Sequence, residues 1–498
     1  MATVTFRAIR GGSAWAVFAA AALALGGCSS KAAAPASSCV PVANGCAGVP
    51  DGDVCGGDTC TDGVACASVV AVSDDASLAA AAGQAASGSC IALRAGSYAG
   101  VVLPGGVSLL GKGASSVTIG SVEAKAGSGA VIRGMSIGSG GLLLDDDVVA
   151  ARVDSVRVAG TLGNGITLGV RGAATIESVW LDHVGWGSST TTPAGQGYAI
   201  YASGAASLTV QKTRVTDSAG PGLWLQSCKD GCACATPTSV TATGIIIEGS
   251  QLVGASLSGV KGSLQDVSVA STTPFWKSGE QGGGVSIAQC SDVTTTALHV
   301  SNNQLYGLLI DHSSAQIGDA STPQGIIIEG NQAYGVWVQN IGQWASGLQA
   351  VSLSGAVVRG NSGVGIGVDG GSRGIIIEGS SVEGTAMKSM PVSIGQGAQG
   401  QNDVGDGLSW MQGSQLVIKS LALSGNARAG ALFAGQWGGG SSANLQLGDG
   451  NAHGIIIEGV DASSTPPGLQ SVDPSQITRS ANFAFPAALG PAAPVAMN

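Results

Sequence analysis

The hydrophobic positions of this chain fall in short runs separated by Gly, Asn and Ser, and few segments show helical periodicity. One hexapeptide, Gly-Ile-Ile-Ile-Glu-Gly, occurs four times, beginning at Gly244, Gly325, Gly374 and Gly454. β-Branched side chains favour a pleated strand over a helix, and the flanking glycines end the strand. Each copy therefore predicts one short strand in a repeating unit.

The repeating unit is clearest between Ala356 and Asp369, where a strand, a turn containing Asn361 and a second strand opened by Gly363 follow one another. Similar units run from Leu298 to Asp311, from Ile326 to Gln339 and from Leu421 to Phe433. Units recur roughly every 20 to 30 residues, as solenoid coils do. Asn tolerates the left-handed turn conformation, and stacked Asn side chains can hydrogen-bond along a solenoid. We expect about a dozen coils between residues 100 and 459.

The hexapeptide copies are expected to mark the register of this solenoid. Glu329, Arg359 and Glu378 would then occupy equivalent sites in three successive coils, with two Ile of each copy inside and Glu outside. An outward column of acid, base and acid would contribute ladder contacts of ~0.2–1 kcal/mol each. Arg359 interrupts the acidic column, so a cation site there is the less favoured interpretation.

The first residues predict export. Arg7 and Arg10 precede an apolar run from Ala14 to Leu25, too short to span a membrane as a mature helix. Leu25-Gly26-Gly27-Cys28 resembles the bacterial lipobox, which implies a signal peptide over residues 1–27 and lipidation of Cys28. Ser29 then favours the outer membrane, by the sorting pattern of such lipoproteins. An ordinary secretory signal with a chance Cys is the alternative.

Eleven Cys fit an exported chain, because that compartment permits disulfides. Residues 28–70 form a Cys-rich linker or mini-module with too few apolar residues for a core of its own. Its five remaining Cys can pair among themselves and with Cys90 as a sixth partner. A second group is predicted to staple a loop to a neighbouring coil and comprises Cys228, Cys232, Cys234 and Cys290. No paired CxxC with zinc spacing occurs.

The pattern changes at Asp74, which with Asp75 can cap a short Ala-rich helix through Ala86. The stretches 88–98 and 101–113 that follow resemble the start of right-handed parallel β-helix proteins of the pectate-lyase-like superfamily. The resemblance implies a helix that plugs the open end, where a solenoid needs a cap. We therefore expect an all-β chain with a single right-handed parallel β-helix over residues 71–460. A Pro/Ala-rich tail, residues 461–498, would follow it.

The composition and net charge of the chain restrict the classes of binding partner that we expect. Gly makes up 82 of 498 residues, aromatic residues 4% and charged residues 10%, and the composition is uniform after the first ~70 residues, as one domain would be. The net charge of -10 argues against a nucleic-acid partner. The expected partners are an extracellular polysaccharide and, through the lipid anchor, a membrane; the chain itself is expected to be a monomer.

The second strand of each unit carries the candidate binding residues. Alternation separates its two faces, and its outward register contains aromatic, amide and carboxylate side chains that suit sugar rings and hydroxyls. These are Tyr201, Trp224, Gln226, Asp311, Trp337, Gln339 and Asp369. Insertions at 185–196, 271–283 and 380–406 precede this strand and would wall a shallow groove, adding Trp276, Asp403 and Asp406. Neutral surface decoration is the alternative for these loops.

Evidence for catalysis is thinner. Val179-Trp180-Leu181-Asp182-His183 resembles the "vWiDH" block of pectate lyases, but Leu181 replaces the usual Ile and the accompanying Arg motifs are absent. Enzymes of that superfamily hold Ca²⁺ with paired carboxylates or use Asp pairs as acid and base. The resemblance therefore leaves Ca²⁺ open as a cofactor, with Asp182, His183, Asp311 and Asp369 as candidate catalytic residues. A second Asp-His at Asp311 and His312 suggests ordinary turn chemistry instead.

These observations favour a cell-surface lipoprotein whose β-helix presents a shallow polysaccharide-binding groove without catalysis. A polysaccharide lyase or glycoside hydrolase is the first alternative, and whether the chain is an enzyme stays open. A protein-binding adhesin is the second alternative, because exposed aromatic residues would serve it equally well.

Overall fold

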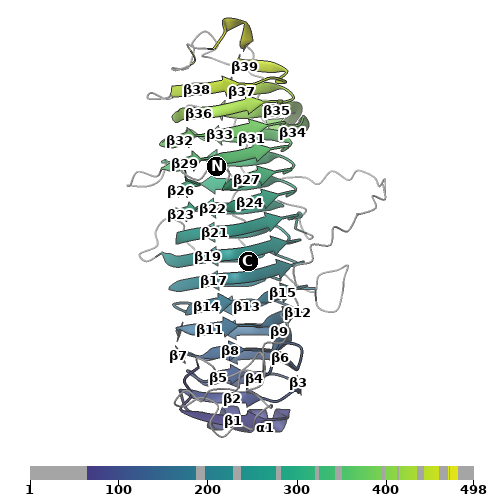
Figure 1. Cartoon of the computed structure of the whole chain (residues 1–498), viewed down its shortest axis with the longest axis vertical. Coiled ribbons are helices and arrows are strands. Elements are labelled where there is room, and N and C mark those ends of the chain that lie inside the picture. Colours follow the sequence, from purple (N-terminus) through teal and green to yellow (C-terminus); the bar gives the residue numbers. More distant parts are fainter. Residues whose placement is uncertain are drawn as a thin grey trace, which may run out of the picture.

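A long stack of parallel strands forms the body of the molecule (Figure 1). The computed structural model describes residues 64–186, 197–227, 237–275, 282–319, 325–342, 350–393, 399–411, 414–434, 442–458, 469 and 472–480. Each typical coil contributes three strands to three parallel sheets, which we call A, B and C in the order that the chain visits them. This confirms the expected parallel β-helix, and it adds a third sheet to the two strands per unit that the sequence suggested.

The first strand of sheet A is β3. Several long strands bend at a corner, so that one half of each lies in sheet A and the other half lies in a neighbouring sheet. Its strands are β3 (Gly96–Tyr98), β6 (Val117–Ala124), β9 (Ser136–Leu144), β12 (Arg157–Ala159), β15 (Trp180–Asp182), β17 (Ser207–Thr216), β19 (Thr238–Glu248), β21 (Val260–Ala270), β24 (Leu298–Ser301), β27 (Ile326–Glu329), β30 (Ala356–Arg359), β33 (Ser380–Glu383), β36 (Leu416–Ser424) and β38 (Ser442–Leu447).

Sheet B also includes the second halves of β6 and β9. Its other strands are β4 (Val101–Leu103), β13 (Ile166–Leu168), β16 (Ile200–Ser203), β18 (Leu223–Gln226), β20 (Val253–Ser258), β22 (Gly283–Ala288), β25 (Tyr306–Asp311), β28 (Tyr334–Gln339), β31 (Gly363–Asp369), β35 (Gln399–Met411), β37 (Ala429–Ala434), β39 (His453–Glu458) and β40 (Ile477–Ser480).

Sheet C includes the first halves of β17, β19, β21, β36 and β38. Its other strands are β1 (Ser68–Val72), β2 (Ser89–Leu93), β5 (Ser108–Leu110), β8 (Val131–Arg133), β11 (Ala151–Asp154), β14 (Ala173–Glu177), β23 (Asp292–Thr295), β26 (Ser314–Ile317), β29 (Val351–Ser354) and β32 (Ile375–Glu378). Three short strands lie apart, namely β7 (Gly127–Ser128), β10 (Val148–Val149) and β34 (Lys388–Ser393), and a 3-10 helix, η3, spans Pro474–Gln476.

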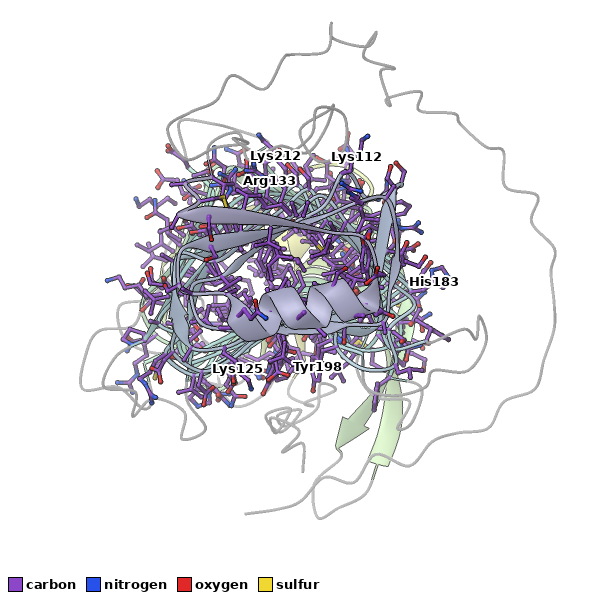
Figure 2. All side chains as sticks on the ribbon, turned by 90° about the horizontal axis from the view of Figure 1, so that it is seen from below. Lys112, Lys125, Arg133, His183, Tyr198 and Lys212 are labelled. Atoms are coloured by element: carbon purple, nitrogen blue, oxygen red, sulfur yellow. A yellow bond between two sulfur atoms is a disulfide. The ribbon has the colours of Figure 1, made fainter. Side chains whose placement is uncertain are left out.

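The helix α1 (Asp75–Gln84) lies across the N-terminal end of the stack, where Figure 2 shows it in front of the coils. Asp74 is its N-cap and accepts a hydrogen bond from the backbone N–H of Ser77 at 2.7 Å. Leu78, Ala81 and Ala82 are buried in the main core cluster. The helix expected from Asp74 is therefore present, and its apolar side closes one end of the core.

The four hexapeptide copies do not lie in equivalent places, contrary to the expectation that they mark one register. Two copies lie in sheet A, within β19 and β27, the third forms β32 in sheet C, and the fourth lies in β39 of sheet B. In every copy the first and third Ile are buried. A strand with two inward Ile between flexible glycines fits equally well in any of the three sheets. The motif therefore predicts a strand but does not predict which sheet contains it.

The prediction that Glu329, Arg359 and Glu378 form one acid–base column was therefore only partly correct. Arg359 does lie beside Glu329, and its Nε donates to Oε2 at 2.7 Å. The next register partner of Arg359 is Glu383, whereas Glu378 belongs to sheet C and lies beside Ser354. All of these contacts are on the surface, so each contributes little to stability.

Stacked asparagines tie the turns between sheets A and B together, as the sequence suggested. Asn303 Nδ2 donates to Asn331 Oδ1 at 2.9 Å, and Asn331 Nδ2 donates to Asn361 Oδ1 at 2.9 Å. Asn426 and Asn451 repeat the contact further along at 2.8 Å. These side chains satisfy buried polar groups at a corner that no strand pairing covers.

The structure shows a disulfide at the N-terminal end of the β-helix and an additional strand at its C-terminal end. Cys66 and Cys90 form a disulfide, which joins the end of the Cys-rich segment to the first coil, and Cys290 is also disulfide-bonded. At the other end β40 pairs with β39, so strand pairing continues beyond residue 460. Within the described ranges no helix is long and apolar enough to cross a membrane. The predicted signal peptide, Cys28 and residues 481–498 lie outside those ranges.

Candidate functional site

Three aromatic side chains meet on the outer face of sheet B, and we call Tyr198, Tyr201 and Trp224 the aromatic platform. Tyr201 on β16 and Trp224 on β18 are register partners in adjacent coils. The ring centroid of Tyr198 lies 5.1 Å from that of Tyr201 and 5.8 Å from that of Trp224. Tyr201 and Trp224 are half-buried, so each presents part of its ring to solvent.

Polar side chains border the aromatic platform along the same face. Thr167 precedes Tyr201 in its column, and Ser256 follows Trp224. Gln226 is half-buried in the next outward column. Burial, and then the charge of Tyr201, raises the pKa of Tyr198 to about 12, so its hydroxyl keeps its proton at neutral pH. An apolar surface edged by hydroxyls and an amide is the kind of surface that binds sugars.

Further along sheet B the outward column is covered, and the prediction that Trp337 and Gln339 face solvent is wrong. Trp337 is 5% exposed and Gln339 1% exposed. Tyr334 stacks on Trp337, with ring centroids 4.8 Å apart and ring planes 12° apart. The register partner of Trp337 is Gly367, where a Cβ would lie only 3.0 Å from the Tyr334 ring, so the absent side chain leaves room for the stacked pair.

These rings belong to a second hydrophobic cluster, which is separate from the core inside the coils. It is built on the outer face of sheet B from large apolar side chains in successive coils. Its members are Tyr306, Leu309, Ala333, Tyr334, Trp337, Val364, Met390, Val404, Met411, Ala429, Leu432, Ala434 and Ile456. Outward direction therefore does not mean exposure in this half of the sheet.

Asp369 is buried beside this cluster, so its predicted exposure is also wrong. It is 4% exposed and lies two coils from Asp311, with Gln339 between them in one column. Burial, and then the charge of Asp311, raises its pKa to about 7. The indole N–H of Trp337 acts in the opposite direction, although it completes no hydrogen bond of ordinary geometry. A buried Asp369 does not form an open acid–base pair with Asp311.

Asp311 itself is held by its neighbours. His312 Nδ1 lies 2.8 Å from Asp311 Oδ1, and Asn340 Nδ2 donates to the same oxygen at 2.8 Å.

The two candidate carboxylates of the third insertion have different environments. Asp403 is exposed, as predicted. Asp406 is fully buried in β35, where Arg428 Nε donates to its Oδ1 at 2.8 Å and Ser409 Oγ donates to its Oδ2 at 3.2 Å. The prediction that Asp406 lines an open groove is therefore wrong, because its charge is compensated inside the protein.

Asp182 and His183 lie at the corner where sheet A leads into sheet B. Three donors surround the Asp182 carboxylate: Arg157 Nη2 at 3.0 Å, Thr216 Oγ1 at 2.9 Å and His183 Nδ1 at 2.9 Å. Partial burial acts to raise the pKa of Asp182, but these donors outweigh it and hold that pKa below its usual value.

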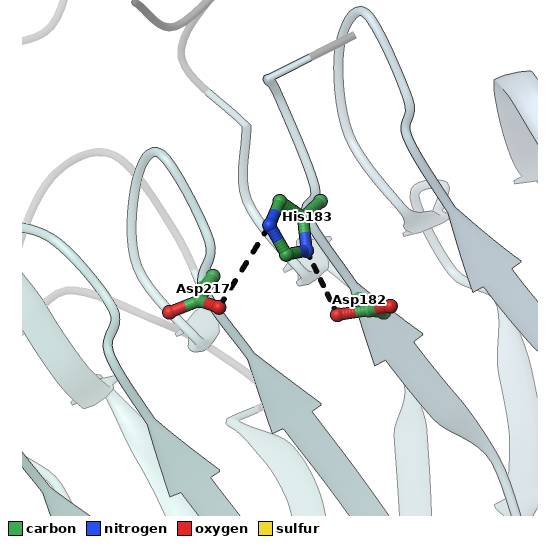
Figure 3. A group of neighbouring side chains, drawn as sticks. All are labelled: Asp182, His183 and Asp217. Atoms are coloured by element: carbon green, nitrogen blue, oxygen red, sulfur yellow. Dashed lines mark hydrogen bonds and ion pairs between the residues drawn. The ribbon is translucent and has the colours of Figure 1, made fainter. Parts of the chain in front are cut away.

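Asp217 completes a group of three potential ligands with Asp182 and His183 (Figure 3). One ligand atom from each lies within 4.8 Å of the others, and His183 Nε2 is 3.9 Å from Asp217 Oδ2. Trp180 lies nearby and is 42% exposed, with the Arg157 guanidinium 4.5 Å from the centre of its ring. The described residues thus contain two separate candidate surfaces, a group of charged side chains at this corner and the aromatic platform on sheet B.

Sequence comparison agrees with the coiled architecture. Residues 132–382, half of the chain, match the family model described as "right handed beta helix region". The chain belongs to this family. No curated protein sequence matches it significantly.

Several solved β-helix structures resemble the chain at low sequence identity. A double mutant of the periplasmic alginate epimerase AlgG is 10% identical with a TM-score of 0.38, covering 74% of this chain and 76% of that one. The A-module of the Azotobacter vinelandii mannuronan C-5 epimerase AlgE4 is 14% identical with a TM-score of 0.37, covering 76% and 92%. The PL6 alginate lyase AlyGC is 11% identical with a TM-score of 0.31, covering 78% and 71%. Likeness at this level says nothing about what this chain does.

All three predicted insertions of this β-helix leave from the corner between sheets A and B, as expected. In the third insertion β34 and the first part of β35 form an antiparallel hairpin, which projects from the body in Figure 2. Met390 of the hairpin approaches Gly363, and Lys388 donates to the backbone carbonyl of Gln332. Trp276 and most of the first two insertions lie outside the described residues, so the groove stays a prediction.

The acidic turn of residues 145–147 and the carboxylate of Asp406 do not suit Ca²⁺, which prefers six to eight oxygen ligands. In the acidic turn of residues 145–147, Asp145 binds Lys125 at 3.1 Å, and Arg171 binds Asp147 at 2.6 Å. Asp406 is bound by Arg428. Asp145, Asp147 and Asp406 are therefore each compensated by a cation of the protein.

Three residues of these surfaces were missed by the sequence analysis. Tyr198 precedes its strand and so fell outside the alternating pattern. Arg157 and Asp217 lie in the coils before and after Asp182, 25 and 35 positions away in the chain. Asp217 directly follows a sheet A strand, as His183 does, whereas Arg157 opens its strand beside Trp180. These neighbours become visible in the sequence only after the coils are aligned.

Proposed function

We propose that this β-helix binds an extracellular polysaccharide through the aromatic platform without modifying it. The observation that carries the proposal is the half-buried pair Tyr201 and Trp224, packed on Tyr198 and bordered by Thr167 and Gln226. Flat apolar rings with polar edges suit pyranose faces and hydroxyls together. The two coils bring the rings ~4.8 Å apart along the axis, so the surface extends in the direction of the stack.

The geometry gives less support to catalysis. Asp369 is buried, and Asp182 is held between Arg157 and Thr216. A lyase would release an unsaturated uronate chromophore from acidic polysaccharides, and a hydrolase would release reducing ends. Either product from the purified chain would favour the enzymatic alternative.

The proposal is tested by measuring retention of the chain on a broad panel of immobilised glycans. Trp224→Ala should weaken binding by at least about tenfold, because an aromatic anchor of a binding surface contributes more than ~1.4 kcal/mol. Trp180→Ala is the matched control, since Trp180 is also exposed but lies on sheet A, and it should bind as the wild type does. Equal binding by all three proteins would exclude the platform. Binding to a protein ligand alone would favour an adhesin.

We further propose that Cys28 is lipidated and anchors the chain to the outer membrane. Two or more acyl chains give stable anchoring, so detergent and not salt should release the protein from membranes.

A further inference from the structure

Two stacked turns place His183 and Asp217 side by side at the corner between sheets A and B. Both residues have left-handed backbone conformations, with φ of 50° and 53°, and the His183 N–H donates to the carbonyl of Thr216 in the next coil. Their side chains are 41% and 56% exposed. In the following coil Gly249 leaves room for the Asp217 carboxylate, because a Cβ there would lie 2.4 Å from Oδ1.

The hydrogen bond to Asp182 decides which His183 nitrogen is available. An ionised carboxylate only accepts hydrogen bonds, so the proton of the neutral imidazole lies on Nδ1 and the lone pair on Nε2. That lone pair faces Asp217 Oδ2 at 3.9 Å, which is too long for a hydrogen bond. Within the described residues His183 is the only side chain that pairs with the Asp217 carboxylate. Two electron-pair donors thus face each other with no proton donor between them.

We propose that His183 and Asp217 together bind a divalent transition-metal ion, with Zn²⁺ as the representative. Zn²⁺ binds imidazole nitrogen and carboxylate oxygen at about 2.0–2.2 Å in a tetrahedral arrangement, which places two ligand atoms of one ion roughly 3.4 Å apart. The observed separation is 3.9 Å, and both side chains are exposed, so a small side-chain movement brings the two atoms to this distance. Imidazole with carboxylate suits Zn²⁺, Cu²⁺ or Ni²⁺, and water completes the coordination, whereas Ca²⁺ requires more oxygens.

Asp182 acts as a positioning residue in this site. Its two oxygens are already engaged by Arg157 and Thr216, so it is not free to bind the ion directly. By holding Nδ1–H it fixes the ring and directs Nε2 outward, as carboxylates behind metal-binding histidines commonly do. Arg157 also neutralises the charge of Asp182, which leaves Asp217 to supply the negative charge at the ion.

The site is independent of the proposed polysaccharide surface. His183 and Tyr198 lie on different sides of the cross-section in Figure 2. Loss of metal binding would therefore leave glycan retention unchanged, and the two proposals can fail separately.

The test is calorimetric titration of the untagged exported chain with ZnCl₂ after chelator treatment. The wild type should take up one ion at a saturable site. His183→Ala should abolish this uptake, Asp217→Asn should weaken it by at least about tenfold, and Asp182→Asn should weaken it by about 10–100-fold. The first two side chains are exposed, so these variants should melt at the wild-type temperature.

His312→Ala is the matched control. His312 follows Asp311 in the same left-handed conformation, and its Nδ1 lies 2.8 Å from that carboxylate. One coil on, however, stands Asn340, which donates to Asp311 and offers no second charge. This variant should bind Zn²⁺ as the wild type does. Absence of a saturable site in the wild type, or full uptake by His183→Ala or Asp217→Asn, would overturn the proposal.

Discussion

At the residue scale, three positions in one outward column of sheet B illustrate how neighbours set the environment of a side chain. Asp311 keeps access to solvent and is bound by Asn340, whereas Gln339 and Asp369 are enclosed. The backbone presents all three in the same direction. What differs is the bulk of the adjoining column, where the stacked Tyr334 and Trp337 rings take up the space.

The buried carboxyl of Asp369 should make stability depend on pH. An unfolded Asp ionises near pH 4, whereas burial, and then the charge of Asp311, raises the pKa of Asp369 to about 7 in the folded chain. Between these values the folded chain binds more protons than the unfolded chain, so stability falls as pH rises from about 4 to about 7 and then levels off. Asp369→Asn should match the wild type at pH 4 and exceed it at pH 8 by up to ~4 kcal/mol.

Urea unfolding of both proteins at pH 4, 6 and 8 measures this difference. A constant offset between the two proteins across the whole range would mean that Asp369 titrates as an ordinary carboxyl.

Residue by residue, the sequence predicted well on which face of a strand a side chain lies, and predicted poorly how exposed that side chain is. Period-2 alternation correctly placed Trp224 and Trp337 on the outer face. Their different exposure depends on partners one coil away, Ser256 and Gly367, which are 32 and 30 positions further along the chain. Such partners can be identified only after every coil length is known.

At the scale of single elements, the hexapeptide shows that a short alternating motif is enough to specify a strand with one buried face. In its first copy Ile245 and Ile247 are buried and Ile246 is 41% exposed, and the same inside–outside alternation holds in sheets A and C. In the copy in β39 the middle residue, Ile456, is also covered, because it joins the outer cluster of sheet B. The motif therefore encodes a strand with one apolar face, and the surrounding coil decides the rest.

The two faces of that strand should respond differently to truncation. Ile247→Ala removes a fully buried side chain and should cost about 2–5 kcal/mol, because it leaves a cavity in the core. Ile246→Ala changes the exposed neighbour and should stay within about 0.5 kcal/mol of the wild type. Urea midpoints at one pH provide the measurement. Similar losses at both positions would contradict the observed alternation.

At the scale of the whole molecule, the coil architecture was predictable because it repeats. Strand, Asn turn and second strand recur in the sequence, and the stacked Asn303, Asn331 and Asn361 confirm the alignment of these units. The third sheet was missed because its strands, such as β26 and β29, are four residues long and carry no distinctive motif. The turn lengths, which set the sheet of each hexapeptide copy, follow no pattern in the sequence.

The helix α1 should keep the chain from associating end to end. It contacts β1, β2 and β4 at the first coils, and Leu78 is buried in the main core cluster. Leu78→Asp should displace the helix and expose strand edges, which pair readily with other chains. Light scattering should then detect larger particles than in the wild type, whereas Ala79→Asp, on the exposed side of the same helix, should scatter as the wild type does. Unchanged light scattering by Leu78→Asp would show that the first coil does not need the helix to prevent association with other chains.

The placement of the hexapeptide copies also bears on how the gene can change length. The copies at Gly244 and Gly325 lie 81 residues apart and both fall in sheet A, separated by three coils. Recombination between their coding sequences would remove or add three complete coils, and every later strand would keep its sheet. Exchange between the copies at Gly325 and Gly374 would join sheet A to sheet C and misplace all strands that follow. Of these two exchanges, only the first would give a longer or shorter solenoid that still folds.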